Sequence, residues 1–178
     1  MTMIPRFDTQ EVFNQSPPYE NIDLYSSDVP LMEAVQANGA GGEAASLSAH
    51  GRQWGAAEMF SLGRRANENP PKLHVFDPKG FRRDVVEFYP GYHDLMRASV
   101  AAGLHASTWT SSGRRAAPPA EVVRSARYYM TAQVESGHLC PITMTRAALA
   151  PLAAEPKLLA EVAPKVVTAS YDGTFRPW

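Results

Sequence analysis

Hydrophobic residues recur at helical spacing along most of the chain, which predicts a mainly α-helical protein. The clearest stretch is residues 118–136, where Val123, Ala126, Met130 and Val134 follow one another at intervals of three or four residues. This spacing places the four side chains on one face of a helix, so we expect that face to be buried.

Further helices are predicted over residues 28–38, 43–66, 90–105, 141–150 and 156–164. In the first of these, Leu31, Met32 and Val35 are expected to form the buried side. Gly51 and Gly55 are four residues apart and therefore share one face of the second helix. Because glycine has no side chain, we expect another helix to approach closely there.

Between two of the predicted helices, the pattern changes to that of a β-hairpin. Residues 73–77 and 82–89 are rich in β-branched and aromatic residues, and the turn sequence Pro78-Lys79-Gly80 separates them. Such a turn between two short apolar runs predicts antiparallel pairing.

The two ends of the chain lack a helical period. Residues 1–27 contain three prolines, which block a helix, and five apolar anchors: Val12, Phe13, Tyr19, Leu24 and Tyr25. We expect an extended arm that lies on a surface, either that of its own chain or that of a partner subunit. Residues 166–178 are predicted to form an extended tail. The fold class is therefore a mainly α helical bundle over residues 28–165, with an extended arm and a short β-hairpin.

Charge and composition narrow the class of protein. The 17 basic and 18 acidic residues are scattered over 178 positions, with no basic stripe, so we do not expect this chain alone to bind nucleic acid. The single cysteine excludes an internal disulfide and suits a reducing compartment. The N-terminus has no apolar run typical of a signal peptide, and no stretch is long enough for a membrane helix. We therefore expect a cytoplasmic protein without membrane contact.

The sequence contains none of the common motifs for nucleotides, serine hydrolysis or zinc. The five histidines are widely spaced, and we predict no metal site and no catalytic residue. His138 and Cys140 are two residues apart, and such neighbours do not face each other on a helix. We expect Cys140 to lie in the core and Glu135 with His138 to form a structural pair.

The segment after Pro141 is the best candidate for ligand contact. Thr143, Met144 and Thr145 fall in the first turn of a predicted helix, where backbone N–H groups lack helical partners. Small hydroxyls and a flexible thioether there are able to line a pocket for a flat or long apolar ligand. Ordinary helix packing with local hydroxyl hydrogen bonds explains the same residues.

Three long segments carry a resemblance to a known family. They are EVFNQSPPYENIDLYSSDVPLMEAV (11–35), GRQWGAAEMFSLGRRANENPPKL (51–73) and YYMTAQVESGHLCPITMTRAALAPL (128–152), and EFYPGYHDLM (87–96) fits as well. In this order they resemble the N-terminal helical domain of the AidB-type, adaptive-response branch of the acyl-CoA dehydrogenase superfamily.

The resemblance implies a protein with more domains than this chain holds. Family members bind FAD between a β-sheet middle domain and a C-terminal helical domain, and they usually form tetramers. The flavin motif and the catalytic carboxylate lie in those two domains, so we expect no stable FAD binding by this chain alone. The helix after Pro141 resembles the one that forms a wall of the acyl-CoA pocket. Thr143, Met144 and Ala147 are therefore the predicted lining residues.

Two functions from different classes follow. In the first, the chain is the N-terminal domain of an FAD-dependent oxidoreductase of the DNA alkylation response, inactive alone, with an arm that contacts a neighbouring subunit. In the second, it is a free-standing helical protein-interaction module derived from that domain. A DNA-binding module is a third hypothesis, which the scattered charge disfavours.

Overall fold

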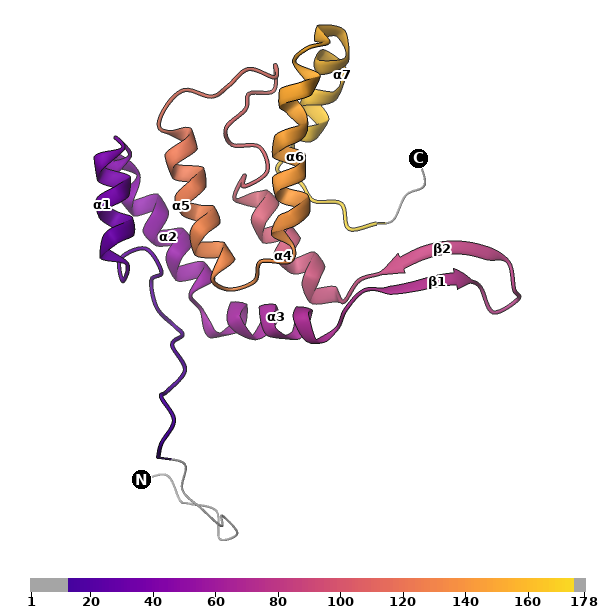
Figure 1. The fold of residues 1–178 in the computed structure, drawn as a ribbon, viewed down its shortest axis with the longest axis horizontal. Helices are drawn as coiled ribbons and strands as arrows, with labels where there is room; N and C mark the ends of the chain where they lie inside the picture. The colour runs from indigo at the N-terminus through magenta and orange to yellow at the C-terminus, as the bar shows by residue number, and fades with distance from the viewer. Residues whose placement is uncertain (1–12, 175–178) are drawn as a thin grey trace.

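The computed structural model describes residues 13–174, and these form a helical body from which one β-hairpin projects (Figure 1). Part of the predicted arm, including Val12, and the end of the predicted tail lie outside the described residues. The elements in chain order are α1 (Val29–Ala37), the 3-10 helix η1 (Gly41–Glu43), α2 (Ala44–Trp54), α3 (Ala57–Glu68), β1 (Lys72–Phe76), β2 (Arg82–Glu87), α4 (Pro90–Ala101), α5 (Ala120–Ala132), α6 (Leu139–Leu152) and α7 (Pro156–Val166). The predicted fold class is confirmed.

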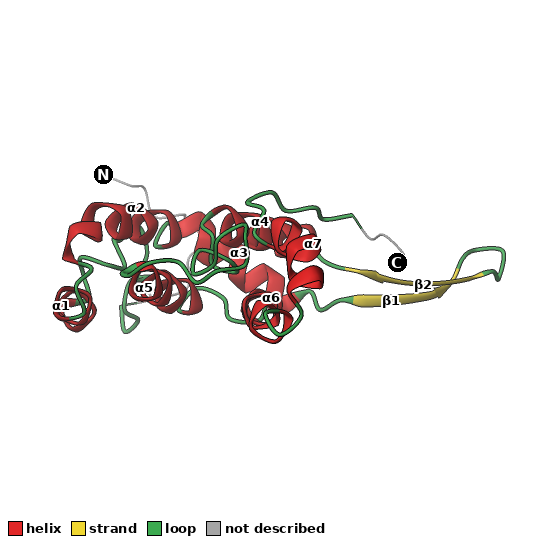
Figure 2. Cartoon of the chain, turned by 90° about the horizontal axis from the view of Figure 1, so that it is seen from above, coloured by secondary structure: helices red, strands yellow, loops and turns green. Residues whose placement is uncertain are grey.

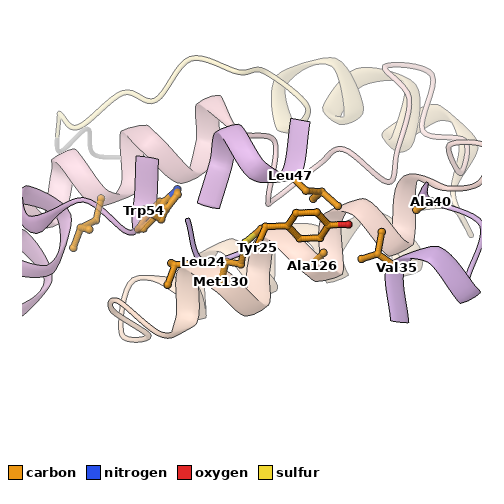
Figure 3. Packing of buried hydrophobic residues seen from close by; sticks show 9 residues of the cluster. Leu24, Tyr25, Val35, Ala40, Leu47, Trp54, Ala126 and Met130 are labelled. Carbon is orange, nitrogen blue, oxygen red and sulfur yellow. The ribbon is translucent and has the colours of Figure 1, made fainter. Parts of the chain in front are cut away.

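The helices pack in two layers, with α1, α5 and α6 in one and α2 and α4 in the other (Figure 2). The main core fills the space between α2, α4 and α5, where Leu47, Trp54, Leu95 and Met130 are fully buried (Figure 3). A second cluster joins α4 to α6 and consists of Met96, Val100, Leu104, Leu139 and Ile142. The apolar face predicted for α5 supplies Ala126 and Met130 to the main core.

Several predicted helix boundaries were wrong, and the backbone explains two of them. The helix expected over 43–66 is interrupted because Ala56 adopts an extended conformation (φ −69°, ψ 145°), which separates α2 from α3. The helix expected to reach residue 105 ends at Ala101, and Gly103 follows in the left-handed region (φ 71°). On α1, Val35 is buried as expected, but Met32 is 38% exposed because its side of the helix faces away from the core.

Part of the predicted arm belongs to the core of its own chain. Leu24 and Tyr25 are buried within the main cluster, whereas Phe13 and Tyr19 are exposed. The pair Gly51 and Gly55 does permit a close approach, but the approaching element is this extended segment and not a helix. The amide N–H of Leu24 donates to the carbonyl of Gly51 (3.3 Å), and that of Ile22 to the carbonyl of Gly55 (3.2 Å).

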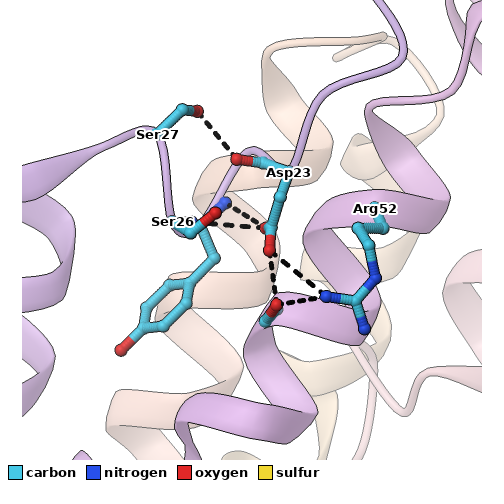
Figure 4. Close-up of polar contacts among 6 residues, drawn as sticks. Asp23, Ser26, Ser27 and Arg52 are labelled. Atoms are coloured by element: carbon cyan, nitrogen blue, oxygen red, sulfur yellow. Dashed lines mark hydrogen bonds and ion pairs between the residues drawn. The ribbon is translucent and has the colours of Figure 1, made fainter.

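Asp23 fixes the turn that follows this approach (Figure 4). Its carboxylate accepts hydrogen bonds from the N–H of Tyr25 (2.9 Å) and from the hydroxyl of Ser48 on α2, and Arg52 lies 3.5 Å away. Burial raises the pKa of Asp23, but these hydrogen bonds outweigh it and leave the pKa below its usual value. The carboxylate therefore stays charged and ties the arm to α2.

The predicted β-hairpin is confirmed as an antiparallel pair in which Leu73 faces Val86 and Lys72 faces Glu87. After α7, residues 168–173 form no helix or strand, and they run back along the helical body, where Thr168 contacts His105 and Tyr171 contacts His93. Within residues 13–174, the helices are too short or too polar to cross a membrane. The division into an arm (1–27), a helical domain (28–165) and a tail (166–178) stays a prediction.

We predict that Gly55→Ala destabilises the chain, because the new methyl group would overlap the carbonyl oxygen of Ile22. Relieving the overlap must move the arm off α2, at a cost of about 1–3 kcal/mol of unfolding free energy in a urea titration. Gly42→Ala is the matched control, since no atom lies within 4 Å of its added methyl group. Equal unfolding midpoints for the two variants would contradict this account.

Candidate functional site

A buried polar cluster precedes α6 and sets the position of that helix. The carboxylate of Glu135 accepts hydrogen bonds from the backbone N–H groups of Gly137 (2.6 Å) and His138 (2.9 Å). The same carboxylate lies 2.6 Å from Nδ1 of His138. These contacts close the turn between α5 and α6, and they fix the residue from which α6 begins. The predicted structural pair of Glu135 and His138 is confirmed.

His138 also contacts two other helices. Its Nε2 lies 2.8 Å from the hydroxyl of Ser99 on α4. Its ring stacks on the indole of Trp54 on α2, with 5.8 Å between centroids and 6° between planes. Nearby, Nε2 of His50 on α2 contacts the hydroxyl of Thr131 on α5 at 3.1 Å. The cluster therefore holds α2, α4, α5 and α6 together through polar contacts inside an apolar core.

The charge states of this cluster follow from its burial. Burial lowers the pKa of His138, and the hydrogen bond that it donates to the charged Glu135 only partly opposes this effect. Burial raises the pKa of Glu135, but three hydrogen bonds from His138 and Gly137 outweigh it and lower the pKa. A charged Glu135 thus accepts the Nδ1–H of a neutral His138, whose Nε2 accepts the hydroxyl hydrogen of Ser99.

The order Ser99, His138, Glu135 is that of a hydrolytic triad, but its surroundings exclude that role. A nucleophile must meet its substrate, whereas Ser99 lies inside α4 and is fully buried. No sequence motif signals this contact, because 39 residues separate Ser99 from His138. The cluster is a structural brace.

Cys140 is exposed, which corrects the prediction that it lies in the core. It occupies the first turn of α6, and its neighbours Leu139 and Ile142 take the buried positions instead. Both ring nitrogens of His138 are engaged elsewhere, so the two residues form no thiol–base pair. Within the described part of the chain, no group of three or more potential metal ligands gathers.

The three predicted lining residues lie on the outward side of α6. Thr143 and Ala147 are exposed, and Met144 is 66% exposed. The hydroxyl of Thr143 contacts the hydroxyl of Tyr128 on α5 at 2.8 Å, which ties this face to the neighbouring helix. A pocket at this face requires a second wall, so the lining role of these residues stays a prediction.

Two of the hollows on the helical body lie near the main core and the buried cluster. One, of about 420 Å³, runs between α1 and α5 and is lined by Leu31, Val122 and Tyr129 among others. The other, of about 330 Å³, lies beside the buried cluster, where the stacked rings of Phe88 and Tyr92 face His138. Neither hollow has a lysine, an arginine or a glycine-rich loop that would hold the phosphates of a dinucleotide, so these residues do not fit FAD.

Comparison with solved structures defines the class of fold. The chain superimposes on "Bd2924 apo-form" with a TM-score of 0.74 at 22% identity, covering 89% of this chain and 32% of that one. It superimposes on Caenorhabditis elegans ACDH-11, solved in complex with C11-CoA, with a TM-score of 0.71 at 19% identity, covering 92% and 29%. The likeness shows the class of fold: a mainly helical domain that corresponds to about a third of each of these longer chains.

Sequence comparison then gives the family. Residues 14–173 match the family described as the adaptive response protein AidB N-terminal domain. The chain is 47% identical over 140 residues to the putative acyl-CoA dehydrogenase AidB of Escherichia coli (strain K12). It belongs to the AidB N-terminal domain family, as the resemblance implied. The match covers 79% of this chain but only 25% of the Escherichia coli protein.

We predict that Glu135→Gln destabilises the chain by about 1.5–3 kcal/mol, because a neutral amide weakens the charge-assisted hydrogen bonds that His138 and Gly137 donate. Urea unfolding measures the change. Glu161→Gln on the exposed side of α7 is the control and should change the unfolding free energy by less than about 0.5 kcal/mol. Similar losses in both variants would mean that the buried cluster does not brace the fold.

The stability of the chain should also fall as the pH decreases from 6.5 towards 4.5. Burial and the nearby charge of Arg127 lower the pKa of His50 to about 4, whereas in the unfolded chain its pKa is about 6.5. In this window the unfolded state binds more protons, so acid favours unfolding by up to about 1.4 kcal/mol per pH unit for this residue. The lowered pKa values of His105 and His138 act in the same direction.

Replacing His50 shows how much this residue contributes to the pH dependence of the unfolding free energy. In His50→Gln, the unfolding free energy should change less steeply between pH 6.5 and 4.5 than in the wild type, as measured by urea titrations at several pH values. His74→Gln is the control, because His74 is exposed on the hairpin. Parallel profiles for wild type and His50→Gln would refute the assignment.

Proposed function

We propose that this chain is the N-terminal module of a longer, FAD-dependent acyl-CoA dehydrogenase-like protein of the alkylation response type. In that protein it forms one wall of the acyl and flavin pocket and has no activity alone. The observation that carries the proposal is the family match over residues 14–173, which leaves three quarters of the Escherichia coli relative without a counterpart here.

The outward face of α6 supports the proposed wall. A thioether as exposed as that of Met144 gains free energy when it is covered, at roughly 25 cal/mol for each Å² of apolar surface buried. Thr143 supplies a hydroxyl and Ala147 a small apolar surface on the same helix. A flat or long apolar ligand suits these groups, and an acyl-CoA-like molecule is the proposed substrate class.

The buried cluster gives this wall a fixed position. Glu135 and His138 determine where α6 begins, and the contact between Tyr128 and Thr143 holds its outward side to α5. In the proposed protein the flavin supplies the redox chemistry, and the remaining domains supply the flavin site and the catalytic carboxylate. This chain supplies a rigid apolar surface that positions the acyl group and excludes water.

We also propose that the arm contacts a neighbouring subunit in a homo-oligomer, which is a tetramer in the family. Phe13 is 88% exposed and Tyr19 is 70% exposed, whereas Leu24 and Tyr25 anchor the same segment in the core. The free-standing interaction module is the alternative. A reading frame that stops directly after Trp178 would favour that alternative.

The test uses the longer polypeptide encoded past Trp178. We expect it to bind FAD at close to one flavin per chain, measured by visible absorbance, whereas the 178-residue chain binds none. Ala147→Trp in the longer polypeptide should weaken acyl-CoA binding about tenfold or more, in a titration that monitors the flavin spectrum, because the indole fills the proposed pocket.

Two controls accompany this test. Ala160→Trp, on the exposed side of α7, should leave acyl-CoA binding unchanged, and both variants should keep the wild-type flavin content. Stoichiometric flavin on the 178-residue chain would contradict the proposed division of roles. Equal acyl-CoA affinity in Ala147→Trp and wild type would remove α6 from the pocket.

A further inference from the structure

The β1–β2 hairpin extends away from the helical body, and in the described residues its strands pair extensively only with each other (Figures 1 and 2). Its large apolar side chains are uncovered: Leu73 and Phe76 are each 62% exposed, and Phe81 is 68% exposed. An isolated two-stranded hairpin is at best marginally stable in water. A hairpin of this composition therefore gains stability from contact with another element.

The two faces of the hairpin differ in character. Leu73 lies opposite Val86, and strand alternation places both on one face. On the other face Lys72 lies opposite Glu87 and His74 lies opposite Val85, and His74 contacts the carboxylate of Glu87 at 2.6 Å. Three of these four side chains are charged or polar and suit water, whereas the pair of Leu73 and Val86 is entirely apolar and suits burial. We call the face of Leu73 and Val86 the apolar hairpin face.

The tail of the chain runs next to this hairpin. Nε2 of His105 contacts the carbonyl of Thr168 at 2.9 Å, and Nδ1 of His93 contacts the hydroxyl of Tyr171 at 2.8 Å. These two contacts lead the tail from the helical body to the base of β2. A hollow of about 300 Å³ there is lined by Val85–Phe88 on one side and by residues 171–174 on the other.

We infer that the apolar hairpin face is the docking surface for the polypeptide that follows Trp178 in the longer protein. This inference rests on the proposed function, in which that polypeptide exists. The contacts of Thr168 and Tyr171 bring residues 171–174 to the base of β2, from where the following polypeptide continues. Val86 belongs both to the hollow there and to the apolar hairpin face. A covalently attached segment acts at an effective concentration in the millimolar range, an advantage that a second copy lacks.

Amide hydrogen exchange distinguishes the possible occupants. In the 178-residue chain, amides of residues 72–87 should exchange at close to the rate of an unfolded peptide. In the longer polypeptide the same amides should exchange at least about tenfold more slowly, and their exchange rate should be the same at low and high protein concentration. Exchange that is no slower in the longer polypeptide overturns the inference. Protection in the 178-residue chain that grows with concentration would instead assign the surface to a second copy.

A pair of variants tests the face itself. Leu73→Asn should lower the melting temperature of the longer polypeptide by several degrees but leave that of the 178-residue chain unchanged. Lys72→Asn, on the opposite face, should change neither. Equal effects of the two variants on the longer polypeptide overturn the inference. Flavin content tests the proposed function separately. A longer polypeptide that binds no FAD refutes that function, whereas amide exchange in the hairpin tests the docking surface whether or not FAD is bound.

Discussion

The structure depends on one buried imidazole. His138 stacks on Trp54 of α2, contacts Ser99 of α4, and contacts Glu135 directly before α6. A polar group in an apolar interior is costly unless all its hydrogen-bonding atoms find partners, and here both ring nitrogens do. Because each partner comes from a different part of the chain, this requirement also fixes how the helices stand relative to one another.

This arrangement connects the interior to the surface that we assign to ligand contact. The turn closed by Glu135 starts α6 with Leu139 and Ile142 facing the core. Helical periodicity then places Thr143, Met144 and Ala147 on the outward side. The face is therefore rigid without being covered, which suits a wall that another domain completes. The hairpin also leaves its apolar face uncovered. Unlike α6, however, it has little support from the rest of the described chain.

The chain belongs to the AidB N-terminal domain family, and its FAD site is proposed to lie in other domains of a longer protein. The hollow between α1 and α5 and the hollow beside His138 have no lysine, arginine or glycine-rich loop for a dinucleotide, although flavin chemistry defines the wider family. In the proposed longer protein, this chain contributes the shape of a pocket and another domain contributes the cofactor site. The exposed faces of this chain, on α6 and on the hairpin, are the surfaces at which that meeting is proposed.

The sequence by itself determined the mainly helical class, the hairpin and the family, because periodicity, turn residues and long matching segments are local properties. It did not determine the break at Ala56, the burial of Leu24 and Tyr25 beside α2, or the exposure of Cys140. It also showed Glu135 and His138 as a pair but not Ser99 and Trp54 as their partners. These features depend on contacts between residues far apart in the chain, and only the tertiary structure brings such residues together.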